Sequence, residues 1–414
     1  MSNPTTVVRW VRGEKGGVGI EALLSIHPAY HGMLRPARFP EISNPVKSGI
    51  RRNQSRQSLA AALAVVTLAA LLSSDAVVAC IDVGFYDRTC PSAETLVQQT
   101  VAAAFGNDSG VAPAIIRLHF HDCFVKGCDG SVLIDSTPGN KAEKDSAPNF
   151  PSLRFFDVVD RAKAALEAQC PGVVSCADVL AFAARDSVVL SGGLGYQVPA
   201  GRRDGRVSTE TDALNNLPGP TSTASDLVAG FAAKNLTVED IVVLSGAHTI
   251  GVSHCSSFTE RIYNFPNTTD GIDPKLSKAY AFLLKGICPP NSNQTFPTTT
   301  TLMDLITPAR FDNKYYVGLT NNLGLFQSDA ALLTNATMKS LVDSFVRSEA
   351  AFRTRFARSM LKMGQIEVLS GAQGEIRRNC RVINPTNVTS AGAVHHHLLP
   401  RSSASSGSNQ VAAS

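Results

Sequence analysis

The sequence has no apolar run long enough to cross a lipid bilayer. Its longest mild apolar run, residues 59–72 (LAAALAVVTLAALL), has fourteen residues, whereas a membrane-spanning helix needs about twenty. Three arginines between residues 51 and 56 precede this run, and the small residues Val77-Val78-Ala79 follow it. This order is typical of a secretory signal peptide cut near Ala79, and the alternative is a buried core helix. We therefore expect a secreted protein with no membrane span.

The sequence also lacks an excess of positive charge outside its N-terminal part. The 414-residue chain has a formal net charge of +4. Nine basic but only four acidic residues precede residue 80, so the remainder has a net charge of −1. This distribution gives no case for a nucleic-acid partner. We predict a basic leader over residues 1–58 that is unusual for a secreted chain, a signal peptide over 59–79, a folded domain over 80–384 and a disordered extension over 385–414.

Strand-like alternation is scarce, and the sequence contains no internal repeat. Helical periodicity dominates instead, which predicts an all-α fold with minimal β structure. The predicted helices cover residues 92–105, 111–124, 152–168, 175–188, 224–233, 237–244, 275–286, 312–319, 337–346 and 349–365. Start signals include Ser152, Thr237 with an aspartate three residues on, and Ser328-Asp329, which opens one more helix.

Cysteine, in contrast, is abundant, and secretion makes disulfides the expected state of these thiols. The nine cysteines are Cys80, Cys90, Cys123, Cys128, Cys170, Cys176, Cys255, Cys288 and Cys380. Because nine is odd and Cys80 stands at the predicted cleavage point, Cys80 is expected to be unpaired. The other eight allow 105 pairings, and their spacing does not choose among these. Six glycosylation sequons fit a secreted glycoprotein: Asn107, Asn235, Asn267, Asn293, Asn335 and Asn387.

A concentrated polar stretch, Arg117-Leu118-His119-Phe120-His121-Asp122-Cys123, follows an apolar segment. Burying such groups is costly unless each has a partner or a task. A helix starting near Val111 would tolerate Pro113 in its first turn. On this helix Arg117 and His121 are four residues apart and share one face. A cation and an imidazole side by side in an apolar pocket indicate a site that handles a small polar substrate.

Two segments are rich in oxygen ligands. Asp122, Asp129 and Ser131 surround a glycine-bearing loop, which suits a hard cation such as Ca²⁺, although the spacing is not that of an EF-hand. A solvated acidic loop is the alternative. The second segment contains Asp304, Thr307 and Asp312, and its alternative interpretation is helix capping by Thr307.

A second candidate histidine, His248, lies among the small and apolar residues 242–251. A satisfied core histidine is one interpretation. A zinc site is poorly supported, because zinc needs three or four ligands at suitable spacing. One imidazole combined with a separate pocket that contains arginine and histidine is instead the arrangement of a haem site.

Long motifs around these residues resemble those of a known family. Residues 116–131 resemble the distal signature of the secretory (class III) plant haem peroxidases, and residues 244–251 resemble their proximal signature. The resemblance covers about residues 81–384. Supporting matches are Phe85-Tyr86, Cys90-Pro91, Glu143-Lys144-Asp145, residues 174–178, residues 201–204 and residues 311–316.

The resemblance implies distal and proximal helical lobes that sandwich haem b within residues 80–384. It implies that His248 is the axial iron ligand and that Asp329 accepts its other ring N–H. His121 would be the base that moves the peroxide proton, oriented by Asn149.

Further roles follow from the same resemblance. Arg117 would stabilise charge that develops on the O–O bond, Phe120 would shield the oxidised centre, and Pro218 would lie in the donor-binding region. The distal Ca²⁺ ligands would be Asp122, Val125, Gly127, Asp129 and Ser131. The proximal Ca²⁺ ligands would be Thr249, Asp304, Thr307, Arg310 through its backbone carbonyl, and Asp312. The implied disulfides are Cys90–Cys170, Cys123–Cys128, Cys176–Cys380 and Cys255–Cys288.

The expected function is therefore that of a secreted, monomeric haem peroxidase. It would reduce H₂O₂ to water and oxidise small phenolic donors by one-electron steps, with roles in H₂O₂ removal, oxidative stress and cell-wall phenolic metabolism such as lignin. The expected location is the extracellular space or cell wall, and the C-terminal extension leaves the vacuole open. The alternatives are an intracellular ascorbate-type peroxidase, a non-catalytic wall or defence glycoprotein on the same scaffold, and a zinc hydrolase.

Overall fold

The computed structural model describes residues 81–290 and 299–385. The predicted leader, signal peptide, Cys80, the sequons at Asn293 and Asn387, and residues 386–414 of the predicted extension lie outside these described residues. The helices are α2 (Ala93–Asn107), α3 (Val111–Lys126), α4 (Phe156–Gln169), α5 (Cys176–Leu190), α6 (Glu210–Asn216), α7 (Ala224–Ala233), α8 (Val238–Ser245), α9 (Thr259–Tyr263), α10 (Lys278–Ile287), α11 (Lys314–Thr320), α12 (Gln327–Ala331), α13 (Ala336–Arg347) and α14 (Glu349–Met363). A single two-stranded antiparallel sheet pairs β1 (Val252–His254) with β2 (Thr300–Leu302) within the described part of the chain. The predicted all-α class with minimal β structure is confirmed.

Every periodic segment predicted from the sequence forms a helix, and Thr237 caps α8 through a reciprocal bond with Asp240. Two helices were missed. α6 has seven residues and α9 has five, which is too short for apolar periodicity to be visible. One predicted start was wrong: α4 begins at Phe156 rather than just after Ser152. Phe155 has φ +64°, a left-handed conformation that a helix cannot continue through.

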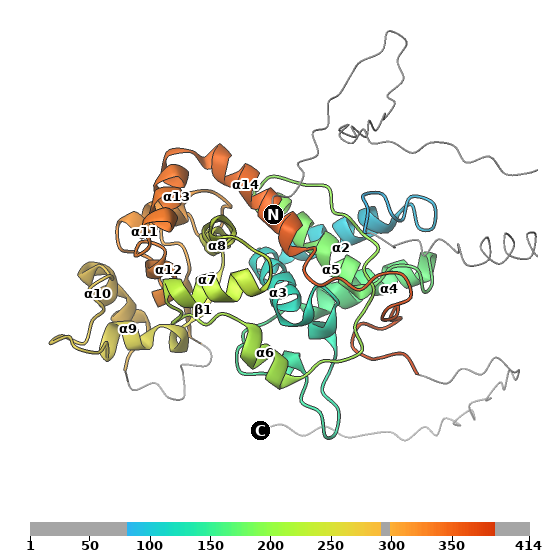
Figure 1. Cartoon of the computed structure of the whole chain (residues 1–414), viewed down its shortest axis with the longest axis horizontal. Helices are drawn as coiled ribbons and strands as arrows, with labels where there is room; N and C mark the ends of the chain where they lie inside the picture. Colours follow the sequence, from blue (N-terminus) through green and yellow to red (C-terminus); the bar gives the residue numbers. More distant parts are fainter. Residues whose placement is uncertain (1–80, 291–298, 386–414) are drawn as a thin grey trace, which may run out of the picture. The chain divides into compact units, whose positions relative to one another are not determined.

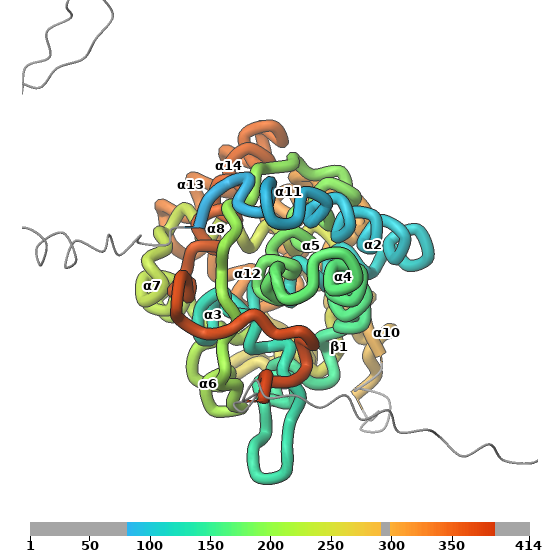
Figure 2. Tube along the Cα trace, turned by 90° about the vertical axis from the view of Figure 1, so that its right-hand side faces the viewer, coloured from blue at the N-terminus to red at the C-terminus, as the bar shows by residue number. Residues whose placement is uncertain are grey.

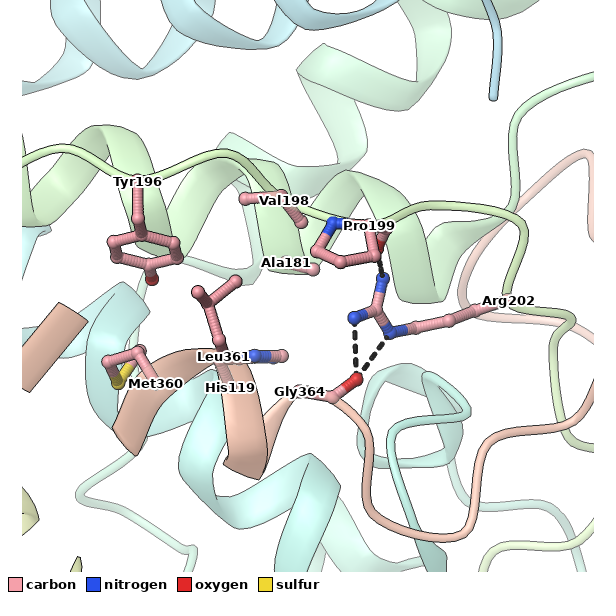
Figure 3. Close-up of a pocket in the computed structure, with 9 residues that line it drawn as sticks. All are labelled: His119, Ala181, Tyr196, Val198, Pro199, Arg202, Met360, Leu361 and Gly364. Atoms are coloured by element: carbon pink, nitrogen blue, oxygen red, sulfur yellow. Dashed lines mark hydrogen bonds between the residues drawn. The ribbon is translucent and has the colours of Figure 1, made fainter. Parts of the chain in front are cut away.

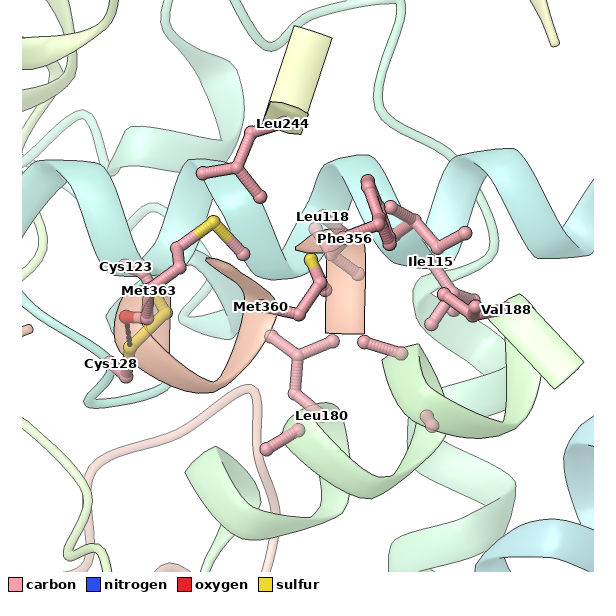
Figure 4. Close-up of a cluster of buried hydrophobic side chains, with 14 of the residues drawn as sticks. Ile115, Leu118, Cys123, Cys128, Leu180, Val188, Leu244, Phe356, Met360 and Met363 are labelled. Carbon is pink, nitrogen blue, oxygen red and sulfur yellow. Dashed lines mark hydrogen bonds between the residues drawn. A yellow bond between two sulfur atoms is a disulfide. The ribbon is translucent and has the colours of Figure 1, made fainter. Parts of the chain in front are cut away.

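Helix α3 forms the centre of the main hydrophobic core. It buries eleven of its sixteen residues, as expected of a helix covered on several sides. In Figure 1, α2, α4 and α5 lie on one side of α3, and α8 with α11 to α13 lie on the other. The close-up in Figure 4 shows the shared core, where Leu118 of α3, Leu180 of α5, Leu244 of α8 and Met360 of α14 gather. The polar stretch of α3 is therefore held in a rigid, apolar setting.

Four disulfides and the C-terminal segment tie distant parts together. The bonds are Cys90–Cys170, Cys123–Cys128, Cys176–Cys380 and Cys255–Cys288. These are the pairs that the resemblance implies. In Figure 2 the segment after α14, in red, crosses the outside of α3. There Cys128 N–H donates to Ile366 O at 3.0 Å, and the buried Arg377 donates to Gly130 O at 2.6 Å.

Among the described residues, the structure contains no helix that combines the length and the apolar character required to cross a membrane.

Candidate active site

One loop orients His121. Helix α3 begins at Val111, as the sequence predicts, and places His121 in its third turn with only 5% of its surface exposed. The His121 Nδ1 atom lies 2.6 Å from Asn149 Oδ1. Because the Asn149 amide nitrogen donates to Glu143 O at 2.7 Å, its oxygen is the acceptor toward His121. His121 therefore carries its proton on Nδ1 and leaves Nε2 as an unprotonated ring nitrogen.

Burial and charge keep this imidazole neutral. Burial is the main reason that the pKa of His121 lies well below its usual value of 6.5. The neighbouring positive charge of Arg117 lowers the pKa further, while the bond to Asn149 acts in the opposite direction. A neutral imidazole with a free Nε2 is suited to accept a proton.

The same loop holds Arg117 on the same face of α3. Its guanidinium donates to Ser152 Oγ and to Pro148 O, both at 3.0 Å. Burial lowers the pKa of Arg117 to about 10, so the group stays charged at neutral pH. Ser152, which the sequence suggested as a helix start, therefore positions Arg117 instead. No sequence signal distinguished this role, because serine is common at both helix starts and turns.

Residues from later in the chain contact α3 at both ends of this face. At the start of α3, a Cβ added to Gly251 would come within 2.9 Å of Pro113 Cβ. At the far end, Phe124 packs against Phe231 of α7 with ring centroids 4.9 Å apart. Arg117, Phe120 and His121 lie between these two contacts on the helix surface. Phe120 is only partly buried and packs on the rings of His121 and Phe124.

His119 belongs to a different environment. Its ring nitrogens lie 3.7 and 3.8 Å from Cys123 Sγ, and it lines a small cavity with Tyr196, Arg202 and Met360 (Figure 3). Burial, with help from the charge of Arg202, lowers the pKa of His119 to about 3. In the described residues, the one close group of three potential metal-binding His, Cys or carboxylate side chains is His119, Cys123 and Cys128. Its two sulfurs are bonded to each other, so the zinc interpretation finds no support here.

His248 lies in the short 3-10 turn Gly246–Thr249 after α8. Its Nδ1 atom is 2.8 Å from Asp329 Oδ1, and 35% of its side chain is exposed. The rings of Tyr315 and Phe326 stand nearly perpendicular to the imidazole at centroid distances of 5.8 and 5.4 Å. His248 is therefore not a fully buried core histidine. The Nδ1 atom is engaged and the ring is held, which leaves Nε2 available to a ligand.

Asp329 is buried, with 1% of its surface exposed, and accepts three hydrogen bonds. Besides His248, its donors are the Tyr315 hydroxyl and the Phe326 N–H, both at 2.8 Å. Burial acts to raise the pKa of Asp329, but the neighbouring His248 and the hydrogen bonds together lower it. Asp329 is therefore a carboxylate at neutral pH. The contribution of Tyr315 was missed by sequence reasoning.

The distal oxygen cluster is buried rather than solvated. Asp122 and Ser131 are fully buried and Asp129 is 4% exposed, and the Ser131 hydroxyl has no hydrogen-bond partner. Burial, followed by the charge of Asp129, raises the pKa of Asp122 well above its usual range, and burial raises that of Asp129 to about 6. Buried carboxylates beside a hydroxyl without a partner are a donor set that fits a hard cation such as Ca²⁺. The burial contradicts the alternative of a solvated acidic loop.

Glu143 joins this cluster and was not assigned a role from the sequence. It is fully buried, and neither of its carboxylate oxygens has a hydrogen-bond partner. Burial raises the pKa of Glu143 to about 8. Its backbone carbonyl is the group that accepts from Asn149. Glu143 therefore connects the oxygen cluster to the loop that orients His121.

The proximal oxygen cluster follows His248 directly. Thr249 Oγ1 donates to Asp304 at 3.1 Å, and Thr307 Oγ1 donates to Asp312 at 2.9 Å. Thr249, Asp304 and Asp312 are buried. Thr307 does not cap a helix in the described part of the chain, because the next helix, α11, has Asn313 as its N-cap. The capping alternative is therefore wrong. The Arg310 side chain forms an ion pair with Asp312 at 3.5 Å, a contact that the resemblance does not imply.

The remaining predicted positions lie in loops. Gly127 ends α3 with φ +90°, and a Cβ there would come within 2.6 Å of Glu367 O. The Val125 carbonyl faces the buried Lys234, whose ammonium lies 3.5 Å away. Pro218 is partly exposed between α6 and α7.

Two imidazoles therefore share one design, in which Nδ1 is bound to a side-chain oxygen and Nε2 is left for chemistry. One imidazole has the partly buried Arg117 beside it, and the other has the buried carboxylate of Asp329 behind it. The imidazole of His248 would hold a haem iron through Nε2, and the neutral His121 with the charged Arg117 would act on a peroxide. The residues present fit haem.

Comparisons with known proteins agree with this chemistry. A family model described as peroxidase matches residues 97–348. The chain is 54% identical to Peroxidase 1 of Zea mays over 341 residues, which cover 81% of this chain and 92% of the relative. It is 55% identical to Peroxidase 5 of Vitis vinifera over 304 residues and 50% identical to Peroxidase 3 of Arabidopsis thaliana over 305 residues, with 73% of this chain and 92% of the relative covered in both cases. The chain belongs to the peroxidase family and, within it, to the class III plant haem peroxidases.

Proposed function

We propose that this peroxidase reduces H₂O₂ to water and oxidises small phenolic donors in one-electron steps, with His248 holding the iron of one haem b. The observation that carries the proposal is the pair of oriented imidazoles, His121 with Asn149 at 2.6 Å and His248 with Asp329 at 2.8 Å. When bound, haem supplies the iron at which the peroxide O–O bond is cleaved and the oxidising equivalents are stored.

His121 moves the proton. Its free Nε2 atom takes a proton from hydrogen peroxide and returns it to the departing oxygen, so that water leaves rather than hydroxide. The charged Arg117 guanidinium stabilises negative charge on the separating oxygens. Because Pro148 O and Ser152 Oγ fix Arg117 and Asn149 fixes His121, little reorganisation is required at the moment of reaction.

His248 and Asp329 would act together at the iron. The carboxylate accepts the His248 Nδ1–H, which makes the imidazole a stronger electron donor to a metal at Nε2. Stronger donation stabilises the higher oxidation states that a peroxidase requires.

Donors are proposed to enter near Pro218 and Phe120. The loop of Pro218 is anchored to the helix of Asp329, because Ser328 N–H donates to Pro220 O at 2.9 Å. The partly buried Phe120 ring restricts access to the oxidised centre. An absorption spectrum of the purified protein, followed by addition of H₂O₂ and guaiacol, tests the proposed function. Absence of a Soret band or of guaiacol oxidation would overturn it.

Replacing Asn149 by valine is expected to slow the reaction with H₂O₂ by about 10- to 100-fold, as is typical when the partner of a functional histidine is removed. The reason is that His121 loses the acceptor that keeps the proton on Nδ1, so Nε2 is protonated part of the time and cannot act as a base. Stopped-flow absorbance measures this rate.

Asn384→Ala is the matched control, since the Asn384 amide donates to Ile376 O at 2.8 Å in the C-terminal segment. This variant is expected to keep the wild-type rate. An unchanged rate in Asn149→Val would contradict the orienting role.

Two Ca²⁺ ions are proposed next to the two histidines. The distal ion would be bound by Asp122, Val125, Gly127, Asp129 and Ser131. The proximal ion would be bound by Thr249, Asp304, Thr307, Arg310 through its carbonyl, and Asp312. The buried carboxylates of both clusters, with the raised pKa values of Asp122 and Asp304, support these sites.

Chelation of Ca²⁺ is expected to lower activity and thermal stability together. Asp122 and Thr249 directly follow His121 and His248 in the sequence, so repulsion among the freed carboxylates would displace the segments that carry both imidazoles. Calorimetry and guaiacol oxidation on decalcified protein, with re-addition of Ca²⁺ as the control, measure both effects. Full activity in protein shown by elemental analysis to be free of calcium would refute the link.

We further propose that the mature protein is a secreted monomer whose peroxidase domain spans residues 80–384. The exposed sequon residues Asn107, Asn235 and Asn267 support a glycoprotein. Asn335 caps α13 through its carbonyl oxygen, which leaves its amide nitrogen for a glycan. The vacuolar alternative depends on the tail after residue 385, which lies outside the described residues. N-terminal sequencing and intact mass of the secreted protein test this proposal.

A further inference from the structure

Tyr315 is attached to the pair formed by His248 and Asp329. Its hydroxyl donates to Asp329 Oδ1 at 2.8 Å, and the same oxygen lies 2.8 Å from His248 Nδ1. We propose that Tyr315 is a positioning residue that competes with His248 for this oxygen and thereby sets the reduction potential of the iron. The inference rests on the proposed function, in which His248 holds haem iron.

The geometry leaves the Tyr315 hydroxyl little freedom. Tyr315 is the second residue of α11 and is 4% exposed. Its ring stands at 85° to the His248 imidazole with centroids 5.8 Å apart, and its centroid lies 5.1 Å from that of Tyr316. A short hydrogen bond between such immobilised groups is maintained without the cost of ordering a side chain.

The Asp329 carboxylate divides its charge among three donors. Oδ2 accepts from the Phe326 N–H, and Oδ1 accepts from both Tyr315 and His248. In a buried site each of these bonds is strong and influences its neighbours. If the Tyr315 bond is removed, more negative charge stays on Oδ1, and the His248 Nδ1–H is attracted more strongly.

The direction of the effect follows from this charge. A stronger pull on Nδ1–H gives the imidazole more anionic character and makes it a better donor at Nε2. A better donor stabilises ferric over ferrous iron, so loss of the Tyr315 hydroxyl should lower the reduction potential. Tyr315 in this way weakens the hydrogen bond between His248 Nδ1–H and Asp329 Oδ1.

The neighbouring tyrosine provides a matched control. Tyr316 is also fully buried, lies on the same helix, and donates to a backbone carbonyl, Val242 O, at 3.0 Å. Tyr315→Phe and Tyr316→Phe each remove one buried hydroxyl and one hydrogen bond. Similar losses of thermal stability are therefore expected. Only the first variant alters the carboxylate behind His248.

The test uses the haem-loaded enzyme and two readouts other than activity. Spectroelectrochemical titration of Tyr315→Phe is expected to shift the ferric-to-ferrous ratio at fixed potential about tenfold toward ferric, which is ~59 mV for a one-electron couple. Resonance Raman spectra of the ferrous protein should show a higher iron–histidine stretching frequency. Tyr316→Phe should leave both quantities at wild-type values. Unchanged values in Tyr315→Phe, or equal shifts in the two variants, would overturn the inference.

A second variant at Tyr315 keeps the inference testable if Tyr315→Phe does not fold. Replacing Tyr315 by 3-fluorotyrosine keeps the shape and makes the phenol a stronger donor, so the potential should move in the opposite direction; no movement would overturn the inference. A wild-type spectrum without histidine-ligated haem would instead refute the proposed function. The two failures are therefore distinguishable.

Discussion

His121→Ala is expected to bind haem and to react with H₂O₂ about 10³- to 10⁴-fold more slowly than the wild type, which is near the upper limit of what a general base contributes. The substitution removes the free Nε2 that accepts the peroxide proton. It leaves His248, the proposed iron ligand, and its partner Asp329 in place. Stopped-flow mixing of the ferric enzyme with H₂O₂ measures the effect, and the Soret band reports haem content.

The control for this experiment is His119→Ala on the same helix. His119 is equally buried but faces the cavity beside Arg202 rather than Asn149. It is expected to lose stability because of the cavity created, while the folded fraction reacts with H₂O₂ at the normal rate. Equal kinetic defects in the two variants would show that helix packing, not proton transfer, explains the loss.

His248→Ala is expected to lose normal haem ligation altogether. The Tyr315 and Phe326 rings and Asp329 would remain around an empty space of imidazole size, and no other described histidine is held in that turn. The expected result is a Soret band that is weak or typical of non-histidine ligation, together with loss of activity. Added imidazole should restore part of the spectrum by occupying the space.

The comparison of the two variants tests the division of roles. His121→Ala should keep histidine-ligated haem without fast peroxide chemistry, whereas His248→Ala should lose the ligation itself. If both variants kept a normal Soret band, or if both lost it, the assignment of one base and one iron ligand would be wrong.

Long helices and motif residues could be predicted because their signals are local. The periodic pattern around residues 111–124 is sufficient to place Arg117 and His121 on one face of α3, since helix geometry relates residues four apart. The five-residue helix α9 shows the limit of this reasoning, because such a helix gains its stability from packing rather than from its own pattern. The late start of α4 was missed for a related reason: the left-handed Phe155 is not marked by a glycine.

The residues of the site also fall into those that the sequence reveals and those that it does not. The identities of the two histidines, the arginine and the oxygen ligands were readable from the sequence, because these residues occur in dense motifs. Ser152, Glu143 and Tyr315 were not assigned their contacts, because each acts through a group far away in the chain. Tyr315 lies 67 residues from His248 and was visible only as part of a matching segment.

The sequence by itself determined the fold class and the chemical groups available, since these depend on residue types and short-range spacing. The reaction type followed from the resemblance of its motifs to a known family. The tertiary structure decided which groups touch. Asn149 directs the His121 proton to Nδ1, and Tyr315 shares the oxygen that Asp329 offers to His248. Hydrogen bonds of 2.6 to 2.8 Å require atoms to be placed within tenths of an ångström. Only the packing of helices from distant parts of the chain achieves that placement.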